Sequence, residues 1–143
     1  MPKVTIADIP LKREYPQESY SRGCRPVYEA GTNGLVYSDF LFPCQNLTSK
    51  ELQFSSLYTF ILTEIGLGDS SYDEIQALQS KLTGGINGSF KLHTIDPNSK
   101  GNLLLSISSK CLEENFGDME KLIFNTLKNA RFDEESRILD LFN

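Results

Sequence analysis

The sequence predicts an α+β domain in which helices pack on one face of a mixed or antiparallel sheet. Two kinds of periodicity support this class: some segments repeat apolar residues at helical spacing, and others alternate apolar with polar residues. The segments follow one another as strand, helix, helix, hairpin, helix and helix. Amphipathic helices in this order bury their apolar stripes most economically as one layer against a sheet.

The 143 residues suffice for one domain. Residues 1–30 hold four of the six prolines and show little periodicity, so we expect an irregular lead-in there. Residues 31–143 are expected to form the single α+β domain. Its last segment, "FDEESRILDLFN", begins a helix with acids in the first turn, and its apolar stripe has barely begun when the chain stops. We therefore expect a C-terminally truncated fragment of a larger protein.

The segment "LVYSDFLFP", residues 35–43, predicts a central strand, because apolar side chains fall on both of its faces. Thr48 and Glu51 then have the spacing of a capping box, in which hydroxyl and carboxylate bind each other's backbone amides at a helix start. We expect the following helix to end at Gly66 in a left-handed cap. Its inward stripe is predicted to consist of Phe54, Leu57, Tyr58, Ile61 and Ile65.

A second capping box, Ser71 with Glu74, predicts another helix that ends near Gly84. "INGSFKLHTI" and "NLLLSISSK" follow as the two strands of an antiparallel hairpin. A third helix is predicted from about Asn115 to Asn129. The inward residues expected of the second helix are Tyr72, Ile75, Leu78 and Leu82, and those of the third are Phe116, Met119, Ile123, Leu127 and Ala130.

Composition argues against several classes of partner. The net charge is -5, the isoelectric point is near 4.9 and no Lys/Arg cluster occurs, which disfavours nucleic acid. No apolar run approaches the roughly 20 residues that cross a bilayer. The N-terminus mixes charge and proline too early for a signal peptide. These features leave the compartment unknown.

Few side chains offer catalytic or metal-binding chemistry. His93 is the only histidine and falls on the polar face of a strand, whereas catalytic zinc usually takes three protein ligands. Cys24, Cys44 and Cys111 lack a CxxC spacing and are expected to be reduced. A Cys–His nucleophilic pair would need His93 close to one of them, and Cys111 is the easiest to bring near.

The glycine-rich stretch "TGGINGS" and the acidic pairs have simpler explanations than a binding site. The glycines follow a helix and lead into a strand, which is the reverse of a phosphate-binding loop. Glu113 with Glu114, and the acids at 133–135, precede or open helices, where the helix dipole favours negative charge. We therefore predict no catalytic, metal-binding or cofactor-binding residue in this chain.

The stretch "LYTFILTEIG…SSYDEIQALQSKLTGGINGSF" resembles the pitrilysin/insulinase-type zinc metallopeptidases, in particular their presequence-protease or falcilysin-like branch. The similarity extends back through "TNGLVYSDFLF" and forward to about Ala130, and it points to the first domain of the C-terminal half of such enzymes. The resemblance implies four similar α+β domains in two halves that close around a chamber. It also implies a zinc ion held in the first of these domains by an H-x-x-E-H motif on the helix after the first strand.

The three motif positions, counted back from Gly66, fall here on Leu57, Phe60 and Ile61, which are all apolar. We expect these positions to be core and Glu64 to be a helix-surface acid. The resemblance then implies a non-catalytic structural domain of a chamber-forming zinc metalloendopeptidase. Zinc and proteolysis of unfolded peptides belong to the parent polypeptide, whose other domains are the expected partners of this chain.

Two alternatives remain at this point. The chain could be a free-standing scaffold or interaction module of the same fold, or a small enzyme that uses Cys111 or His93. A domain cut from a larger assembly is also expected to self-associate through its exposed interface. Neither nucleic acid nor a membrane is an expected partner.

Overall fold

The computed structural model describes residues 16–23, 25–44, 46–94 and 101–142. The chain divides into two compact units, residues 1–33 and 34–143, and each is described by itself. In the first unit, β1 (Glu18–Arg22) pairs antiparallel with β2 (Arg25–Tyr28). The sequence predicts no regular element here, because strands of 5 and 4 residues with few apolar side chains give no periodic signal.

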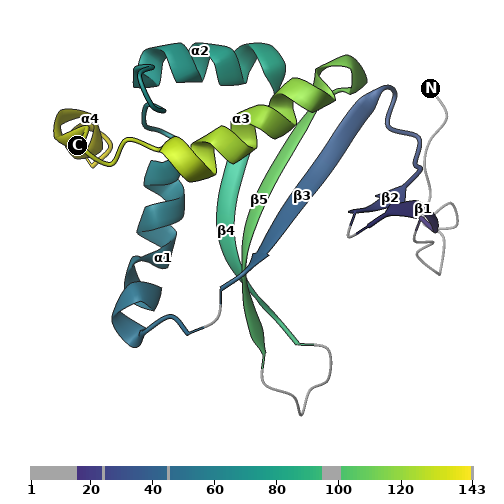
Figure 1. Cartoon of the computed structure of the whole chain (residues 1–143), viewed down its shortest axis with the longest axis horizontal. Coiled ribbons are helices and arrows are strands. Elements are labelled where there is room, and N and C mark those ends of the chain that lie inside the picture. Colours follow the sequence, from purple (N-terminus) through teal and green to yellow (C-terminus); the bar gives the residue numbers. More distant parts are fainter. Residues whose placement is uncertain (1–15, 24, 45, 95–100, 143) are drawn as a thin grey trace, which may run out of the picture. The chain divides into compact units, whose positions relative to one another are not determined.

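The second unit has the predicted α+β architecture (Figure 1). Its strands pair antiparallel in the order β3-β5-β4, which confirms the predicted hairpin of β4 and β5. Two helices lie on one face of this sheet, α1 chiefly against β4 and α3 against β5. The elements are β3 (Leu35–Pro43), α1 (Ser49–Leu62), α2 (Tyr72–Leu82), β4 (Ile86–His93), β5 (Asn102–Leu112), the 3-10 turn η2 (Glu113–Asn115), α3 (Phe116–Asn129) and α4 (Glu135–Asp140).

The sequence predicts that β3 is a central strand. In the sheet that the described residues form, β3 instead lies at one edge. Phe40 and Phe42 pack against the core from its helix side. On the opposite side, Tyr37 is 63% and Leu41 53% exposed. The prediction is wrong because apolar residues on both faces of a strand show only that both faces can be covered. In β3, the face that carries Tyr37 and Leu41 is exposed. The strand β5 takes the central place.

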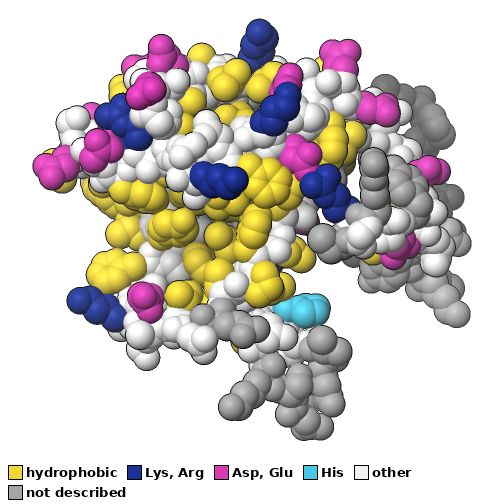
Figure 2. Space-filling view, viewed as in Figure 1, with side chains coloured by type: hydrophobic (Ala, Val, Ile, Leu, Met, Phe, Trp, Pro, Cys, Tyr) yellow, Lys and Arg dark blue, Asp and Glu magenta, His cyan; other side chains and the backbone are white. Residues whose placement is uncertain are grey.

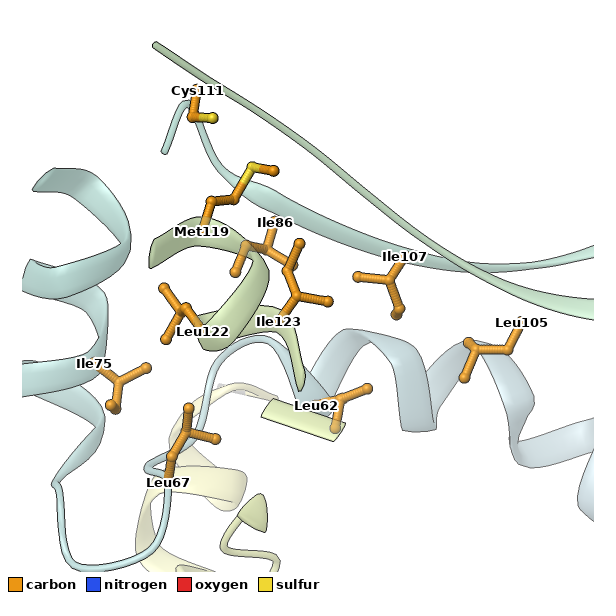
Figure 3. Packing of buried hydrophobic residues seen from close by; sticks show 10 residues of the cluster. All are labelled: Leu62, Leu67, Ile75, Ile86, Leu105, Ile107, Cys111, Met119, Leu122 and Ile123. Atoms are coloured by element: carbon orange, nitrogen blue, oxygen red, sulfur yellow. The ribbon is translucent and has the colours of Figure 1, made fainter. Parts of the chain in front are cut away.

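The core lies between the sheet and the helices, and Figure 3 shows its side chains converging from both layers. Met119 and Ile123 of α3 are 0% exposed, as their helical spacing predicts. They belong to one cluster with Ile107 of the central strand β5, which is 1% exposed. The cluster consists of Leu62, Leu67, Ile75, Ile86, Leu105, Ile107, Cys111, Met119, Leu122 and Ile123.

Glycine at position 88 lets α1 approach the sheet closely. A Cβ atom on Gly88 would lie 3.1 Å from the Cβ of Thr59. Thr59 is 5% exposed, and Leu62, on the same side of the helix, is 1% exposed. The sheet-facing side of α1 is therefore built from Thr59 and Leu62. The stripe predicted above is only partly right: Ile61 and Ile65 are buried, but Phe54 is 53% exposed. A small polar residue suits position 59 because a β-strand backbone lies directly beneath it.

The end of α1 also differs from its prediction. The helix ends at Leu62, and Thr63 is its C-cap, so Gly66 does not cap it. The left-handed backbone belongs to Gly68, with φ 59°. Gly66 is needed for a different reason: a Cβ there would lie 2.5 Å from the Ser70 carbonyl oxygen and 2.8 Å from Glu134 Oε1. Close approach, and not a positive φ, selects glycine at this position.

Both predicted capping boxes are confirmed, whereas the stripe of α2 is only partly right. Ile75 is buried, but Leu78 is 38% exposed. Gln79 is buried in its place, and its Nε2 donates a hydrogen bond to the Thr63 carbonyl oxygen at 3.2 Å. A glutamine can be buried here because the free carbonyl at the end of α1 satisfies it.

The capping box of α1 predicts a pH-dependent contribution to stability. The Thr48 amide and hydroxyl both donate to Glu51 Oε2 at 2.7 Å, and these bonds hold the pKa of Glu51 below its ordinary value of 4.5. A lowered pKa in the folded state stabilises the fold above pH 4.5, and this contribution is lost as the pH falls through the folded value. Glu51→Gln is expected to lower the melting temperature at neutral pH and to have a smaller effect at about pH 3, because the stabilisation declines as the pH falls below 4.5.

Thermal unfolding of the two proteins at both pH values measures this difference. Asp69→Asn is the matched control, because Asp69 is an exposed acid in a turn. Melting temperatures of Glu51→Gln and wild type that differ equally at both pH values would show that the carboxylate charge contributes nothing.

Candidate functional site

The helix α1 carries the three positions at which the resemblance implies zinc chemistry. Leu57 is half-buried, Phe60 is 48% exposed and Ile61 is 8% exposed. All three lie off the sheet-facing side formed by Thr59 and Leu62. The expectation that the whole stretch is core is therefore wrong for Phe60, whereas Ile61 is buried. Hydrocarbon side chains have no lone pair to offer a cation, so zinc does not fit at these positions.

Glu64, two residues past the end of α1, is expected from the sequence to be a surface acid, but it belongs to a polar network. Its Oε2 forms an ion pair with Arg137 Nη2 at 3.2 Å. The Arg137 Nε donates to the Glu64 backbone oxygen at 3.0 Å, and the guanidinium lies 4.3 Å from the centroid of the Tyr72 ring. The Arg137 side chain is only 20% exposed. No local pattern pairs these residues, which are 73 positions apart.

Further hydrogen bonds join the same two segments. The Gly66 amide donates to Glu134 Oε2 at 2.9 Å, and the Arg131 amide donates to the Gly66 carbonyl oxygen at 2.9 Å. Glu134 is 13% exposed in its side chain, so it is not the solvated helix start expected from the sequence. We call this set of contacts between residues 64–68 and 129–137 the clasp. The polar groups of the clasp bind one another, so we interpret the clasp as a structural feature and not as a binding site.

The structure separates the two residues of the possible Cys–His pair. Cys111 lies near one end of β5, whereas His93 pairs with Asn102 at the other end. At about 3.4 Å per residue, the nine steps from residue 102 to residue 111 place these ends about 30 Å apart. Cys111 also faces the core and His93 the opposite side of the sheet. A nucleophilic pair of these two residues cannot form within this fold.

The two cysteines that the structure describes have different surroundings. Cys111 is 3% exposed, and burial raises the pKa of its thiol, which makes it a poor nucleophile. Cys44 is half-buried, and its Sγ donates to the Phe42 carbonyl oxygen at 3.6 Å. Cys24 lies outside the described residues. The described thiols are therefore packed among apolar groups, with no activating partner.

The glycine-rich turn between α2 and β4 uses its amides within the chain. The Gly84 amide donates to the Lys110 carbonyl oxygen at 2.8 Å, and the Gly85 amide donates to Thr83 Oγ1 at 3.0 Å. Gly85 has φ 103°, which explains a glycine at this sharp turn. An anion would have to compete with these internal bonds.

Metal-binding clusters and membrane-spanning helices are both missing from the described ranges. No group of three or more His, Cys, Asp or Glu side chains within those ranges could hold a metal ion. No helix formed by the same residues is long and apolar enough to cross a membrane.

Comparisons with known proteins identify the family. A model of the family described as peptidase M-16C associated matches residues 1–143. The chain is 30% identical over 146 residues to "Presequence protease, mitochondrial" of Danio rerio, covering 96% of this chain and 14% of that protein. Proteins of the same name from Candida albicans and Xenopus tropicalis are 30% and 31% identical, over 98% and 96% of this chain and 14% and 13% of theirs.

The chain thus spans about one seventh of the length of these relatives. The resemblance to the presequence-protease branch is confirmed, and it covers nearly the whole chain. Because the family model matches the chain from end to end, this chain belongs to the peptidase M-16C associated family.

Proposed function

We propose that this chain is a non-catalytic structural domain of a chamber-forming zinc metalloendopeptidase. The observation that carries the proposal is the similarity to presequence proteases over nearly the whole chain, combined with apolar residues at the positions of the zinc motif. A motif with two histidines cannot be formed by a chain that has one histidine. Zinc and the residues that activate water therefore belong to other parts of the polypeptide.

The role of the domain follows from its architecture and surface. A two-layer domain with a buried core can form a rigid wall, and a closed chamber admits only short or unfolded chains. Exposed apolar side chains on both sides of the sheet suit packing against the other domains of the parent enzyme. In this proposal the α+β domain occupies residues 31–143, and its contribution to proteolysis is confinement and support.

The test uses the complete polypeptide that carries this sequence and the 143-residue chain alone. We expect the complete polypeptide to contain an upstream H-x-x-E-H motif and to cleave a fluorogenic peptide. Chelation should abolish cleavage and added zinc should restore it, whereas the chain alone should be inactive.

Two outcomes would contradict the proposal. Cleavage by the chain alone that persists through chelation and disappears in Cys111→Ala or His93→Ala would make it a small enzyme. A complete polypeptide without the motif and without peptidase activity would leave the alternative, a scaffold module of the same fold.

A further inference from the structure

An apolar patch lies on the helix-bearing side of the second unit. Figure 2 shows hydrophobic side chains gathered in one continuous area between α1 and α3. Three aromatic residues on α1 and just after α3 are exposed: Phe54 is 53%, Tyr58 36% and Phe132 45% exposed. We define the apolar patch by Phe42, Cys44, Phe54, Tyr58, Phe124 and Phe132.

Contacts between distant segments hold the patch together. The rings of Tyr58 and Phe132 stack with centroids 5.6 Å apart. At the strand side, Phe124 of α3 meets Phe40 of β3 edge-on at 5.8 Å. Burial raises the pKa of Tyr58, and the negative charge of the Cys44 thiolate after the end of β3 raises it further. The patch is therefore one surface built from α1, α3, β3 and the segment after α3.

The helix layer covers the sheet unevenly. The helix α1 packs chiefly against β4 and α3 against β5. On β3, the helix-side residues Phe40 and Phe42 are only half-buried. An apolar sheet face of an α+β domain is normally covered by a layer of helices about 10 Å away. The described part of the chain leaves that layer incomplete beside β3.

We propose that an amphipathic helix from the rest of the polypeptide docks on the apolar patch and completes the helix layer. The relatives have about seven times the length of this chain, so they contain ample sequence to supply such a helix. The six side chains of the patch carry no charge, so an apolar stripe with anchors at i, i+3 or i+4 and i+7 fits them. The proposal rests on the proposed function, because it requires this chain to be one part of a longer enzyme.

A helix fits the patch better than other occupants. Most side chains of the patch stand on α1, on α3 or just after α3, whereas an added β-strand would pair with the backbone at the open edge of β3 and leave these side chains uncovered. A second copy of this chain would bring its own net charge of -5 to the contact, which disfavours association at low ionic strength. Phe54 and Tyr58 stand one turn apart on α1, which is the row that packs into the groove of a neighbouring helix.

The test places the photo-crosslinking residue p-benzoylphenylalanine at position 54 of the complete polypeptide. We expect crosslinks to one amphipathic segment outside residues 1–143, identified by mass spectrometry. The matched control carries the same residue at position 37, because Tyr37 is 63% exposed on the opposite side of the sheet. Position 37 should not crosslink to that segment.

A second measurement needs no substitution. The half-buried Cys44 should react with iodoacetamide about tenfold more slowly in the complete polypeptide than in the chain alone. Crosslinks from position 54 only to residues 1–33 or to a second copy, equal reactivity of Cys44, or a complete polypeptide that ends with this chain would each overturn the proposal. Crosslinking and cysteine reactivity do not depend on peptidase activity. An inactive polypeptide would therefore refute the proposed function, whereas the docking proposal would still be decided by these two measurements.

Discussion

Ile61→His is expected to lower the free energy of unfolding by about 3 kcal/mol. The substitution removes a side chain that is only 8% exposed and places an imidazole among apolar groups. Burial should lower the pKa of the new histidine below its usual value of about 6.5. The unfolded state then binds the proton more readily, so the loss of stability should grow as the pH falls below about 6.5. Urea unfolding at pH 8 and at pH 5.5 measures both effects.

Substitutions at the other two motif positions serve as a graded comparison. Leu57 is half-buried, so Leu57→His should cost less than Ile61→His. Phe60→Glu should cost the least, since Phe60 is 48% exposed. Ile61→Val is the conservative control, with an expected loss of about 1 kcal/mol. Equal effects at the three positions, or a neutral Ile61→His at pH 8, would show that Ile61 has not become part of the core.

Arg137→Ala is expected to cost about 2–3 kcal/mol. The substitution removes the hydrogen bond to the Glu64 backbone oxygen, the ion pair to its carboxylate and the contact with the Tyr72 ring. It also removes the cationic partner of Glu64, whose side chain is only 35% exposed. Because the clasp ties residues 129–137 to the end of α1, hydrogen exchange should accelerate in both segments. Urea unfolding and exchange of backbone amides measure these changes.

Arg137→Lys and Glu135→Gln separate the causes. Lysine keeps the charge but cannot reproduce the planar fork, so Arg137→Lys should fall between wild type and Arg137→Ala. Glu135 is an exposed residue of the same helix, and Glu135→Gln should change the stability by less than about 0.5 kcal/mol. A change of that small size in Arg137→Ala would mean that the clasp does not stabilise the fold.

Both predictions concern how the chain holds the helix α1. The positions that correspond to the zinc motif have no metal ligands here, yet the end of the helix is firmly anchored. Ile61 contributes apolar burial, and Arg137 together with Glu134 binds the backbone that follows the helix. A helix held in this way suits a domain whose proposed work is support.

Local patterns in the sequence were enough to predict most of the secondary structure and the fold class of the second unit. Capping boxes and helical periodicity in α3 are local signals, and the structure follows both. The alternation in β4 predicts its strand, but only part of its buried face, because Leu92 is 71% exposed. The lack of a zinc site at Leu57, Phe60 and Ile61 could also be predicted from the sequence, because hydrocarbon side chains cannot bind a metal ion in any surroundings. The weak hairpin of β1 and β2 escaped detection because so few of its side chains are apolar.

Which side of each element is covered could be learned only from the packing of the folded chain. Helix α1 does have apolar residues at helical spacing, but Thr59 and Leu62 face the sheet, because Gly88 lets the helix come close there. Periodicity shows that a helix has an apolar side without showing what lies against it. The pairing of Glu64 with Arg137 and the separation of His93 from Cys111 depend likewise on contacts between distant parts of the chain, which no local pattern encodes.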